Sequence, residues 1–384
     1  MSRIDDLIAE HCPDGVEFAP VGDAVEVVAT ARGVQRSQYG EGTLIPIVDQ
    51  GQALIAGYTD DSSVALANGE YIVFGDHTRA VKWVDFPFAP GADGIKVLQA
   101  RNNDVPKFLY YAISNLDIPS RGYNRHWTVL RDLPIALPPL EVQREIVRIL
   151  DTFRELEAEL EAELEARRQQ YAHYRSLLLD FGSEIAWRPL RQVAEIRSGW
   201  GFPLAYQGDE EGDLPFYKVS DMNLLGNETV MRRANNYVSH EVALKLGARA
   251  TPAGTVIFPK IGAAVATNKK RLLSVPSVYD NNVMGLVPNE MLDSRFLYHW
   301  MTTIDLTKLA HDSGAVPSIR SSEMAAFKVP VPGLDQQREI VAVLDHFDAL
   351  VNDLSVGLPA ELTARRTQYE YYRDRLLTFE EAAS

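Results

Sequence analysis

The feature that most constrains the fold of this 384-residue chain is a sequence pattern that occurs twice. Residues 135–153 read IALPPLEVQREIVRILDTF, and residues 329–347 read VPVPGLDQQREIVAVLDHF, at a constant offset of 194. A second pair follows, because ARRQQYAHYRSLLLDF (166–181) matches ARRTQYEYYRDRLLTF (364–379) at an offset of 198. The later copy is therefore longer by four residues, about one helical turn. A repeat of this kind indicates one structural unit that is used twice.

Both copies are predicted to be long amphipathic helices, because their apolar residues recur in steps of three and four. Two equivalent apolar seams in one chain would most simply pack on each other. The predicted seam comprises Ile146, Ile149, Phe153, Leu156, Leu160 and Leu164 in the first helix, and Ile340, Val343, Phe347, Leu350, Leu354, Tyr369 and Tyr372 in the second.

Proline and glycine residues predict where the two helices start and break. Pro138–Pro139 and Pro332 mark the two entrances, since proline belongs at or before the first turn. Gly357 and Pro359 are expected to break or kink the second helix inside its extra turn. The first helix, over 140–181, would be roughly 60 Å long, which is the length of a spacer.

The blocks that precede the two helices resemble each other more weakly. Pro46 and Pro215 lie 169 residues apart, and Phe108-Leu109-Tyr110 matches Phe296-Leu297-Tyr298. Short β-branched and aromatic runs between Gly, Pro, Asn and Asp predict many strands and loops in both. We therefore expect an α+β protein with two mixed α/β blocks and a pseudo-twofold repeat. The predicted divisions are an N-terminal segment (1–19), a first block (20–138), a central helix (139–182), a second block (183–331) and a distal helix (332–380).

Composition and cysteine count predict a cytoplasmic location. The chain is 46% hydrophobic and 24% charged, which is typical of globular proteins. It has no run of 18 apolar residues, so no membrane span is expected. The N-terminal sequence is acidic, unlike a signal peptide. A single cysteine, Cys12, excludes an intrachain disulfide and favours a reducing compartment.

The net charge of −15 at first disfavours a nucleic-acid partner, because DNA binding relies on cations that neutralise phosphates. The charge is unevenly distributed, however. Residues 1–18, 135–183 and 331–384 together account for −13 of the −15. The two large blocks are close to neutral, so each can still present a basic face.

The order of block, helix, block, helix resembles the specificity subunit of a type I restriction–modification system over almost the whole chain. PPLEVQREIVRILD and PGLDQQREIVAVLD resemble the two conserved regions of that family, and GDHTR (75–79), YNRHW (123–127) and SGWGFP (198–203) resemble segments of its recognition domains. The resemblance implies that each block is a target recognition domain that reads one half of a bipartite, asymmetric double-stranded DNA site. It also implies that the helices form an antiparallel coiled coil that separates the domains.

The resemblance further implies partners that carry the chemistry. Two DNA methyltransferase (modification) subunits that use S-adenosylmethionine would bind the helices, and ATP- and Mg-dependent restriction subunits with translocase and nuclease activity would join later. The chain itself shows no glycine-rich cofactor loop and no Walker motif, so no cofactor of its own is expected. Cys12 and His11 lack the four-ligand spacing of a zinc site, so no metal is expected either. We therefore expect a non-catalytic subunit.

The segment LEAELEAELEAR (156–167) contains three tandem four-residue units of strong helix formers. Each added unit would lengthen the helix by ~6 Å. Because DNA rises ~3.4 Å per base pair, one unit would change the half-site spacing by about one or two base pairs. The family is known to tune its spacer in this way. An ordinary solvated acidic helix explains the same composition.

Candidate DNA contacts are polar, cationic and aromatic residues in predicted loops. Arg reads guanine, Asn and Gln read adenine, and Ser, Thr and His contact phosphates or bases. Trp200 is either a wedge into DNA or a lid on its own block. The candidates in the first block are Arg32, Arg36, Gln38, Tyr39, His77, Thr78, Arg79, Arg121, Tyr123, Asn124, Arg125 and His126; those in the second are Ser198, Trp200, Lys218, Lys260, Asn268, Lys269, Lys270, Arg271, Asn281, Asn282, Ser318 and Arg320.

Other functions stay open at this point. One is an enzyme, a nuclease or methyltransferase whose motifs are not recognisable. Another is a coiled-coil scaffold that binds only proteins, which the net charge of −15 favours. A third is the specificity subunit of a related two-subunit system that cuts on both sides of its bipartite site.

Overall fold

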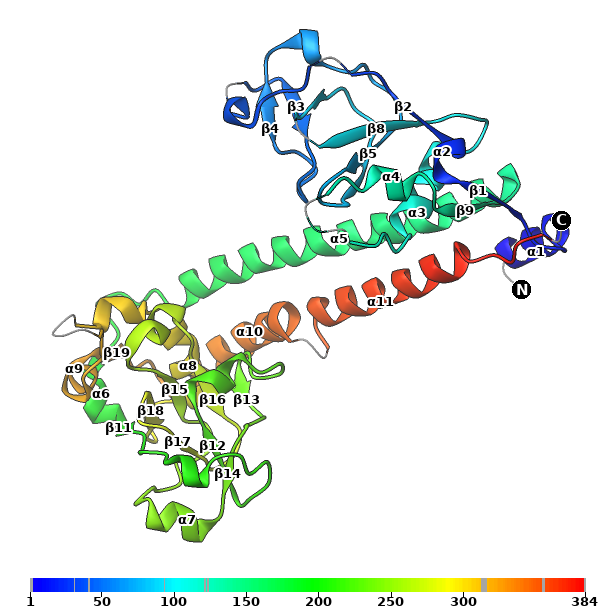
Figure 1. The fold of residues 1–384 in the computed structure, drawn as a ribbon. Coiled ribbons are helices and arrows are strands. Elements are labelled where there is room, and N and C mark those ends of the chain that lie inside the picture. Colours follow the sequence, from blue (N-terminus) through cyan, green and yellow to red (C-terminus); the bar gives the residue numbers. More distant parts are fainter. Residues whose placement is uncertain are drawn as a thin grey trace. The chain divides into compact units, whose positions relative to one another are not determined.

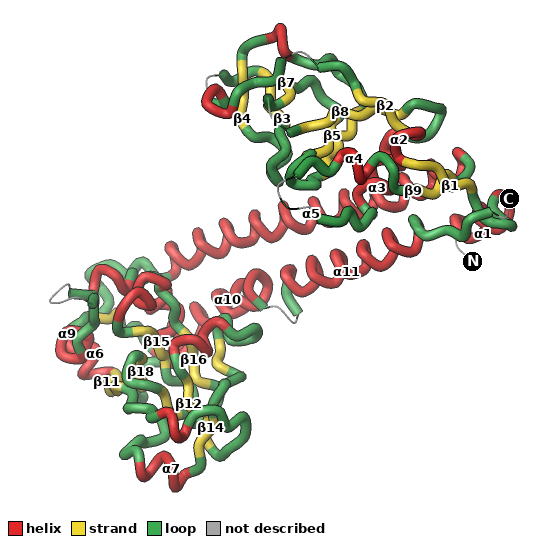
Figure 2. The backbone as a smooth tube through the Cα atoms, viewed as in Figure 1, coloured by secondary structure: helices red, strands yellow, loops and turns green. Residues whose placement is uncertain are grey.

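The computed structural model describes residues 3–30, 32–40, 42–92, 94–120, 122, 124–311, 316–353 and 356–382. The chain divides into two compact units, Met1–Glu157 with Arg365–Ser384, and Ala158–Ala364. Both units combine helices with short strands joined by loops (Figures 1 and 2), which confirms the predicted α+β class. Among the described residues, no helix is both long enough and apolar enough to cross a membrane.

The first unit is built around a four-stranded sheet and a three-stranded sheet. The four-stranded sheet has the order β2-β8-β5-β6, and the three-stranded sheet has the order β4-β3-β7. A separate pair, β1-β9, joins the two ends of the block. The elements are α1 (Arg3–His11), β1 (Glu17–Pro20), α2 (Val21–Ala24), β2 (Val25–Val27), η1 (Arg36–Gln38), β3 (Ile45–Val48), β4 (Gly57–Thr59), η2 (Ser62–Val64), β5 (Tyr71–Gly75), β6 (Val81–Val84), β7 (Ala89–Pro90), β8 (Ile95–Ala100), α3 (Pro106–Ser114), α4 (Trp127–Leu130) and β9 (Pro134–Leu137).

The second unit repeats this arrangement and adds one strand. Its sheets have the orders β11-β18-β15-β16-β13 and β14-β12-β17, and the pair β10-β19 joins the ends of the block. The elements are β10 (Trp187–Pro189), α6 (Leu190–Val193), β11 (Ala194–Ser198), η3 (Leu204–Tyr206), β12 (Leu214–Tyr217), η4 (Val219–Asn223), β13 (Val230–Met231), β14 (Tyr237–Val238), α7 (His240–Lys245), β15 (Val256–Pro259), η5 (Gly262–Thr267), β16 (Arg271–Leu273), β17 (Val278–Tyr279), β18 (Val283–Pro288), α8 (Ser294–Thr302), η6 (Leu306–Leu309), α9 (Ser321–Ala326) and β19 (Lys328–Pro330).

Local sequence explains why corresponding elements form in both blocks. The central strands β5 and β15 are apolar runs whose residues are all buried, as expected of strands covered on both faces. The helix that carries the Phe-Leu-Tyr triplet starts at Pro106 in the first block. In the second block Asp293 caps it, since its Oδ1 accepts hydrogen bonds from the backbone N–H groups of Arg295 and Phe296.

The long helices follow the sequence prediction closely. Helix α5 extends over Leu140–Leu178. The second copy is divided into α10 (Leu334–Asn352) and α11 (Leu358–Leu376), which confirms the predicted break at Gly357 and Pro359. The N–H of Gly357 donates to Asp353 O at 3.1 Å, and α11 begins at the next residue.

Aromatic side chains from the two copies of the helix pattern contact each other inside each unit. In the first unit the ring centroids of Phe153 and Tyr372 lie 5.4 Å apart. In the second, those of Phe347 and Tyr174 lie 5.3 Å apart. Because these two pairs are equivalent in the repeat, each unit holds one copy of the same helix contact.

Not every predicted seam position is buried. Ile146, Leu164 and Ile340 are buried, and Phe153, Ile149, Leu160, Phe347, Leu350, Tyr369 and Tyr372 are half-buried. The prediction was wrong for Leu156 and Val343, which are exposed. Leu354 lies outside the described residues.

Candidate nucleic-acid interface

One edge of the five-stranded sheet in the second unit gathers several predicted DNA contacts. Ser198, the last residue of β11, pairs with Met284 at the start of β18. Pro259, the last residue of β15, pairs with Val283 on the same strand. The loops that continue from these ends therefore leave the sheet at one edge. They carry Trp200, Lys260, Asn281 and Asn282.

Lys260 lies at the centre of this edge. Its Nζ donates a hydrogen bond to Ser198 Oγ at 3.1 Å, and that hydroxyl lies 3.2 Å from Ser321 Oγ. Burial lowers the pKa of Lys260, and the nearby Asp280 carboxylate partly opposes that shift. Ser198 and Ser321 are exposed, so the group presents one ammonium and two hydroxyls at the surface. Such a group can donate hydrogen bonds to phosphate or base oxygens.

Asp280 organises the residues beside Lys260. Its Oδ1 accepts from the backbone N–H of Asn282 at 3.0 Å. Burial raises the pKa of Asp280, while the hydrogen bonds from Asn282 and the charge of Lys218 act against that rise. Trp200 pairs with Asp280 in a β-bridge, and its ring lies 5.8 Å from that of Tyr279. Trp200 therefore packs half-buried against its own block.

The run Asn268–Arg271 is the densest basic run of the sequence, and the structure turns part of it inward. Lys270 is only 3% exposed, and its Nζ donates to Asn268 Oδ1 at 2.7 Å and to Ile304 O. Burial lowers the pKa of Lys270 to about 8. Arg271 donates from Nη1 to Lys270 O at 2.8 Å, and burial lowers its pKa too. The side chain of Lys269 donates to Asn223 Oδ1.

The remaining candidates of the second block lie around the same edge or close to it. Lys218 donates to Gln207 Oε1 at 2.9 Å, which holds its side chain against the preceding loop. Ser318 pairs with Ile261, the residue after Lys260, in a β-bridge. Asn281 and Arg320 are exposed, and Arg320 lies 3.9 Å from Glu323.

The matching sheet edge of the first unit brings together the two motifs GDHTR and YNRHW. Gly75 at the end of β5 pairs with Ile95 at the start of β8. Asp76 follows directly and is 3% exposed. Its Oδ1 accepts from the backbone N–H of Trp127 at 2.7 Å, and its carbonyl oxygen accepts from the backbone N–H of His126 at 2.8 Å. Two segments 50 residues apart are thus joined at one point.

Burial divides the candidates of the first block into two groups. His126 is only 1% exposed, with Nδ1 2.9 Å from Asp76 O, so its ring supports the loop. Arg79 has a φ of 64° and donates to Ile118 O at 2.7 Å, while Thr78 donates to Gln50 O. His77 is half-buried, and Asn124 and Arg125 are exposed. Arg121 and Tyr123 lie outside the described residues.

Two of the four candidates near residue 36 line a cavity of about 520 Å³. Arg32 and Gln38 contribute to its wall together with Asp60 and Asp61. Arg36, Arg32 and Gln38 are exposed, whereas Tyr39 is half-buried and packs against Gly57. Asp76 and His126 are not among the residues that line this cavity.

Two glutamines that sequence reasoning did not select hold each block to its helix. Gln143 Oε1 accepts from Val105 N at 2.8 Å, and its Nε2 donates to Pro138 O at 2.8 Å. Gln337 makes the equivalent contacts, with Asp293 N at 2.7 Å and Pro332 O at 2.8 Å. Their position in the repeated QREI sequence was a visible signal. Sequence reasoning also did not select Gln50, which lies beside His77 and belongs to no motif.

The part of the chain that the structure describes holds no group of three or more His, Cys, Asp or Glu residues placed to bind a metal ion. Cys12 is a free, buried thiol, and burial raises its pKa.

Comparisons with known proteins agree with this geometry. The type I restriction modification DNA specificity domain matches residues 13–166 and 183–364, one match for each unit of the repeat. The chain is 31% identical over 403 residues to the EcoR124I/EcoR124II specificity subunit of Escherichia coli, covering 99% of this chain and 97% of that protein. It is 27% identical over 397 residues to a putative type I restriction enzyme specificity subunit of Haemophilus influenzae, covering 95% and 96%.

A solved structure supports the fold separately. The S subunit of a type I restriction–modification system from M. genitalium superposes with a TM-score of 0.62 at 16% identity, covering 94% of this chain and 96% of that one. The sequence matches extend over nearly the whole length of both partners, and the domain match occurs twice. This chain therefore belongs to the family of type I restriction–modification DNA specificity subunits.

Proposed function

We propose that this chain reads a bipartite, asymmetric double-stranded DNA site on behalf of a type I modification complex. Residues 20–138 and 183–331 are the two target recognition domains, and each reads one half-site. The helices between and after them set the half-site distance and bind two methyltransferase subunits. Restriction subunits join that core complex. The assignment of this chain as non-catalytic belongs to the same proposal, with S-adenosylmethionine, ATP and Mg supplied through the partners.

The observation that carries the proposal is the repeated sheet edge with different side chains. The strands β2-β8-β5-β6 and β11-β18-β15-β16 have the same order, so both blocks place loops at an equivalent edge. The residue that follows the central strand is Asp76 in one block and Lys260 in the other. Two equivalent frameworks with different polar loops suit the reading of two different half-sites. The major groove distinguishes all four base pairs, so we assign the loops to that groove.

The proposed DNA contacts are the predicted residues that the structure leaves at the surface. In the second domain they centre on Lys260 and Ser198, and in the first on Asn124 and Arg125. The buried side chains of His126 and Lys270 support these loops from inside. The proposed contacts also include the other candidates that are exposed, namely Arg32, Arg36, Gln38, Thr78, Arg79, Asn268, Asn281, Asn282 and Arg320. Direct base reading by the remaining predicted residues stays a prediction.

The charge distribution supports a division of labour between this chain and its partners. Of the net charge of −15, the short segments that include the two helices hold −13. Acidic helices repel DNA phosphates and favour a protein partner. Two equivalent helix contacts in one chain also suit two copies of the same partner. We therefore expect weak DNA binding by the isolated chain and strong binding by its complex with the methyltransferase.

The tandem units at 156–167 are proposed to set the distance between the two half-sites. They lie within α5, which continues as helix on both sides of them. The division between the two compact units, at Glu157 and Ala158, falls inside the same segment. Removing one four-residue unit shortens a helix by ~6 Å. At ~3.4 Å per base pair, the accepted gap should shrink by about one or two base pairs.

Methylome sequencing of a host that expresses this chain with its modification subunit tests the proposal. We expect one split motif, and deletion of residues 156–159 should shorten only its gap. The matched control replaces the same four residues with alanine, which keeps the helix length and should keep the gap. A continuous motif, or changed bases with an unchanged gap, would contradict the proposal. Methylation of DNA by the purified chain alone would instead support the alternative that this chain is itself an enzyme.

A further inference from the structure

Each recognition block is joined to its long helix through one carboxylate at an equivalent position. In the first unit, Lys107 Nζ lies 2.9 Å from Asp151 Oδ2, and Tyr111 donates to Asp151 Oδ1 at 2.6 Å. In the second unit, Arg295 Nε donates to both oxygens of Asp345 at 2.9 and 3.0 Å. These contacts connect α3 with α5 and α8 with α10.

The equivalence includes the partners of the carboxylates. Lys107 and Arg295 lie 188 residues apart, and so do Tyr111 and His299. His299 is fully buried, and its Nε2 bonds to Asp345 Oδ1. Burial would raise the pKa of Asp345, but the hydrogen bonds from His299 and Arg295 outweigh it and hold that pKa below its usual range. Asp345 is therefore ionised and bound from two sides at neutral pH.

One helical turn further along, the two joints carry opposite charges. Arg154 in the first unit lies over the rings of Tyr110 and Tyr111, at 5.4 and 5.7 Å from their centroids. The equivalent residue in the second unit is Asp348, which is 6% exposed. The second joint thus relies on a carboxylate where the first relies on a cation–π contact.

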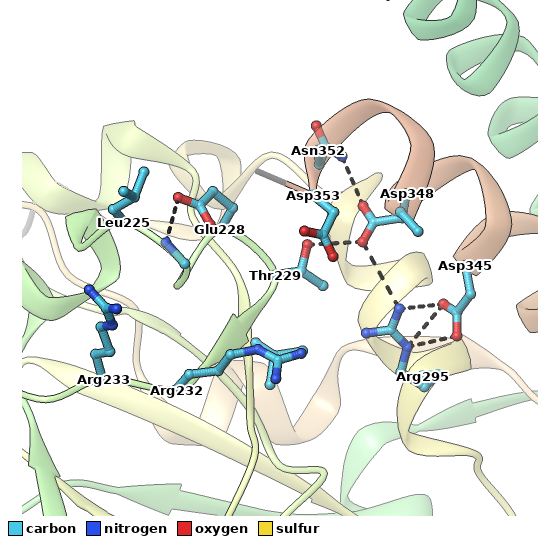
Figure 3. A pocket seen from close by; sticks show the side chains of 13 residues that line it. Leu225, Glu228, Thr229, Arg232, Arg233, Arg295, Asp345, Asp348, Asn352 and Asp353 are labelled. Atoms are coloured by element: carbon cyan, nitrogen blue, oxygen red, sulfur yellow. Dashed lines mark hydrogen bonds and ion pairs between the residues drawn. The ribbon is translucent and has the colours of Figure 1, made fainter. Parts of the chain in front are cut away.

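Asp348 ties a second segment of its block to the helix. Thr229 Oγ1 and Asn352 Nδ2 each donate to Asp348 at 2.9 Å, and Arg295 Nη2 lies 4.0 Å away (Figure 3). A cavity of about 610 Å³ lies beside these side chains, between residues 225–233 and α10. Ile340, Leu344 and Val351 of α10 also pack in the apolar core of the block, but the surface beside Thr229 and Asp348 is hollow. The hydrogen bonds and ion pairs span it.

Charge-assisted hydrogen bonds are directional, and an arginine–carboxylate pair restricts the relative orientation of its two elements. Two carboxylates, one bound to α8 and one to Thr229, fix both tilt and position of the block on α10.

We propose that Asp345 and Asp348 are positioning residues that hold the second recognition domain at one setting on α10 and thereby restrict the complex to one gap length. The inference rests on the proposed function, since gap length has meaning only for a bipartite reader. Neither residue contacts DNA in this proposal. Both act through Arg295 and Thr229.

The test measures the gap distribution of methylated sites in cells that carry the modification subunit and the full chain. Asp345→Asn with Asp348→Asn removes both charges and keeps the side-chain shape. Methylation should spread to sites with the same half-site bases and a gap one base pair longer or shorter. We expect the share of such sites to rise about tenfold, which corresponds to a loss of ~1.4 kcal/mol in the preference for one setting. Asp348→Asn alone should give a smaller rise.

The matched control is Asp335→Asn on the same helix. Asp335 is 96% exposed and pairs only with Arg338 at 3.2 Å among the described residues. Its gap distribution should equal that of the unmodified chain. The share of altered gaps among methylated sites does not depend on total yield, so lower stability alone cannot produce it. A single unchanged gap in the Asn variants would overturn the inference, and the milder Asp348→Asn variant decides the matter if the double variant fails to fold.

The two proposals fail in different ways. If the unmodified chain directs methylation of a split motif while the variants keep its gap, only the positioning role is lost. If the unmodified chain gives a continuous motif, the proposed function itself is lost.

Discussion

The two recognition blocks use the same strands to present different chemistry. At the end of its central strand the first block has Asp76, a buried acceptor that ties down the segment at His126 and Trp127. The second block has Lys260 at that place, a cation that reaches Ser198 at the surface. Backbone pairing and core packing preserve the framework in both blocks. The comparison shows that equivalent strands can end in residues of opposite charge that make different contacts.

Substitution of Gln143 and Gln337, which hold each block to its helix, has the largest expected effect. It tests whether the framework is equivalent in both units. Gln143→Ala and Gln337→Ala each leave buried backbone groups without a partner. A cost of roughly 1–3 kcal/mol in the free energy of unfolding is expected for such a loss. Urea unfolding of the full chain, in separate variants, measures both costs.

The control for these variants is Gln169→Ala on α5. Gln169 is exposed and bonds to Glu165 at 3.1 Å, so its loss should change stability by about 0.5 kcal/mol or less. Similar costs for Gln143 and Gln337 would support equivalent frameworks. A large cost for one variant and none for the other would show that the two frameworks are not equivalent.

The second prediction concerns the loops, where the blocks differ. Lys260→Ala should weaken DNA binding of the chain–methyltransferase complex and reduce the salt dependence of the affinity by about one unit of slope, as for one lost phosphate contact. Lys245→Ala is the control, because Lys245 is exposed on α7 and pairs with Glu241 at 2.7 Å. Binding titrations at several salt concentrations measure both. If the affinities of the two variants depend equally on salt concentration, Lys260 does not belong to the DNA interface.

The third prediction separates Lys270 from its neighbours in the basic run. Burial lowers the pKa of Lys270 to about 8. The unfolded chain keeps this proton up to a pH of about 10.4. Between these values the unfolded state binds more protons, so this group makes the fold more stable as pH rises.

Lys270→Met removes that contribution. The stability of the unmodified chain relative to the variant should therefore increase between pH 7 and pH 9.5, as measured by urea midpoints. A difference that does not change with pH would show that Lys270 is ordinarily solvated. Because Lys270 is 3% exposed, the variant should also leave the salt dependence of DNA binding unchanged.

Patterns that depend on near neighbours were predicted well. The steps of three and four predicted α5, and Gly357 with Pro359 predicted the break between α10 and α11. Helix formation and helix ending are local, so the sequence contains the information directly. Seam positions were predicted less accurately, because the exposure of Leu156 and Val343 depends on what faces them.

The direction of polar side chains was predicted poorly, for a physical reason. His126 and Lys270 belong to loop motifs that look like surface, yet their partners, Asp76 O and Ile304 O, lie 50 and 34 residues away. Pairing over such distances is a property of the folded chain and leaves no local pattern.

By itself, the sequence determined that a helix–block unit occurs twice, where the long helices start and break, and that most of the acidic charge lies outside the blocks. Only the tertiary structure decided which cations reach the surface and how each block is fastened to its helix. Helix periodicity is set by neighbours within a turn or two. The seating of Asp345 and Asp348 depends on groups brought together from residues 229, 295 and 299, and folding alone brings them into contact.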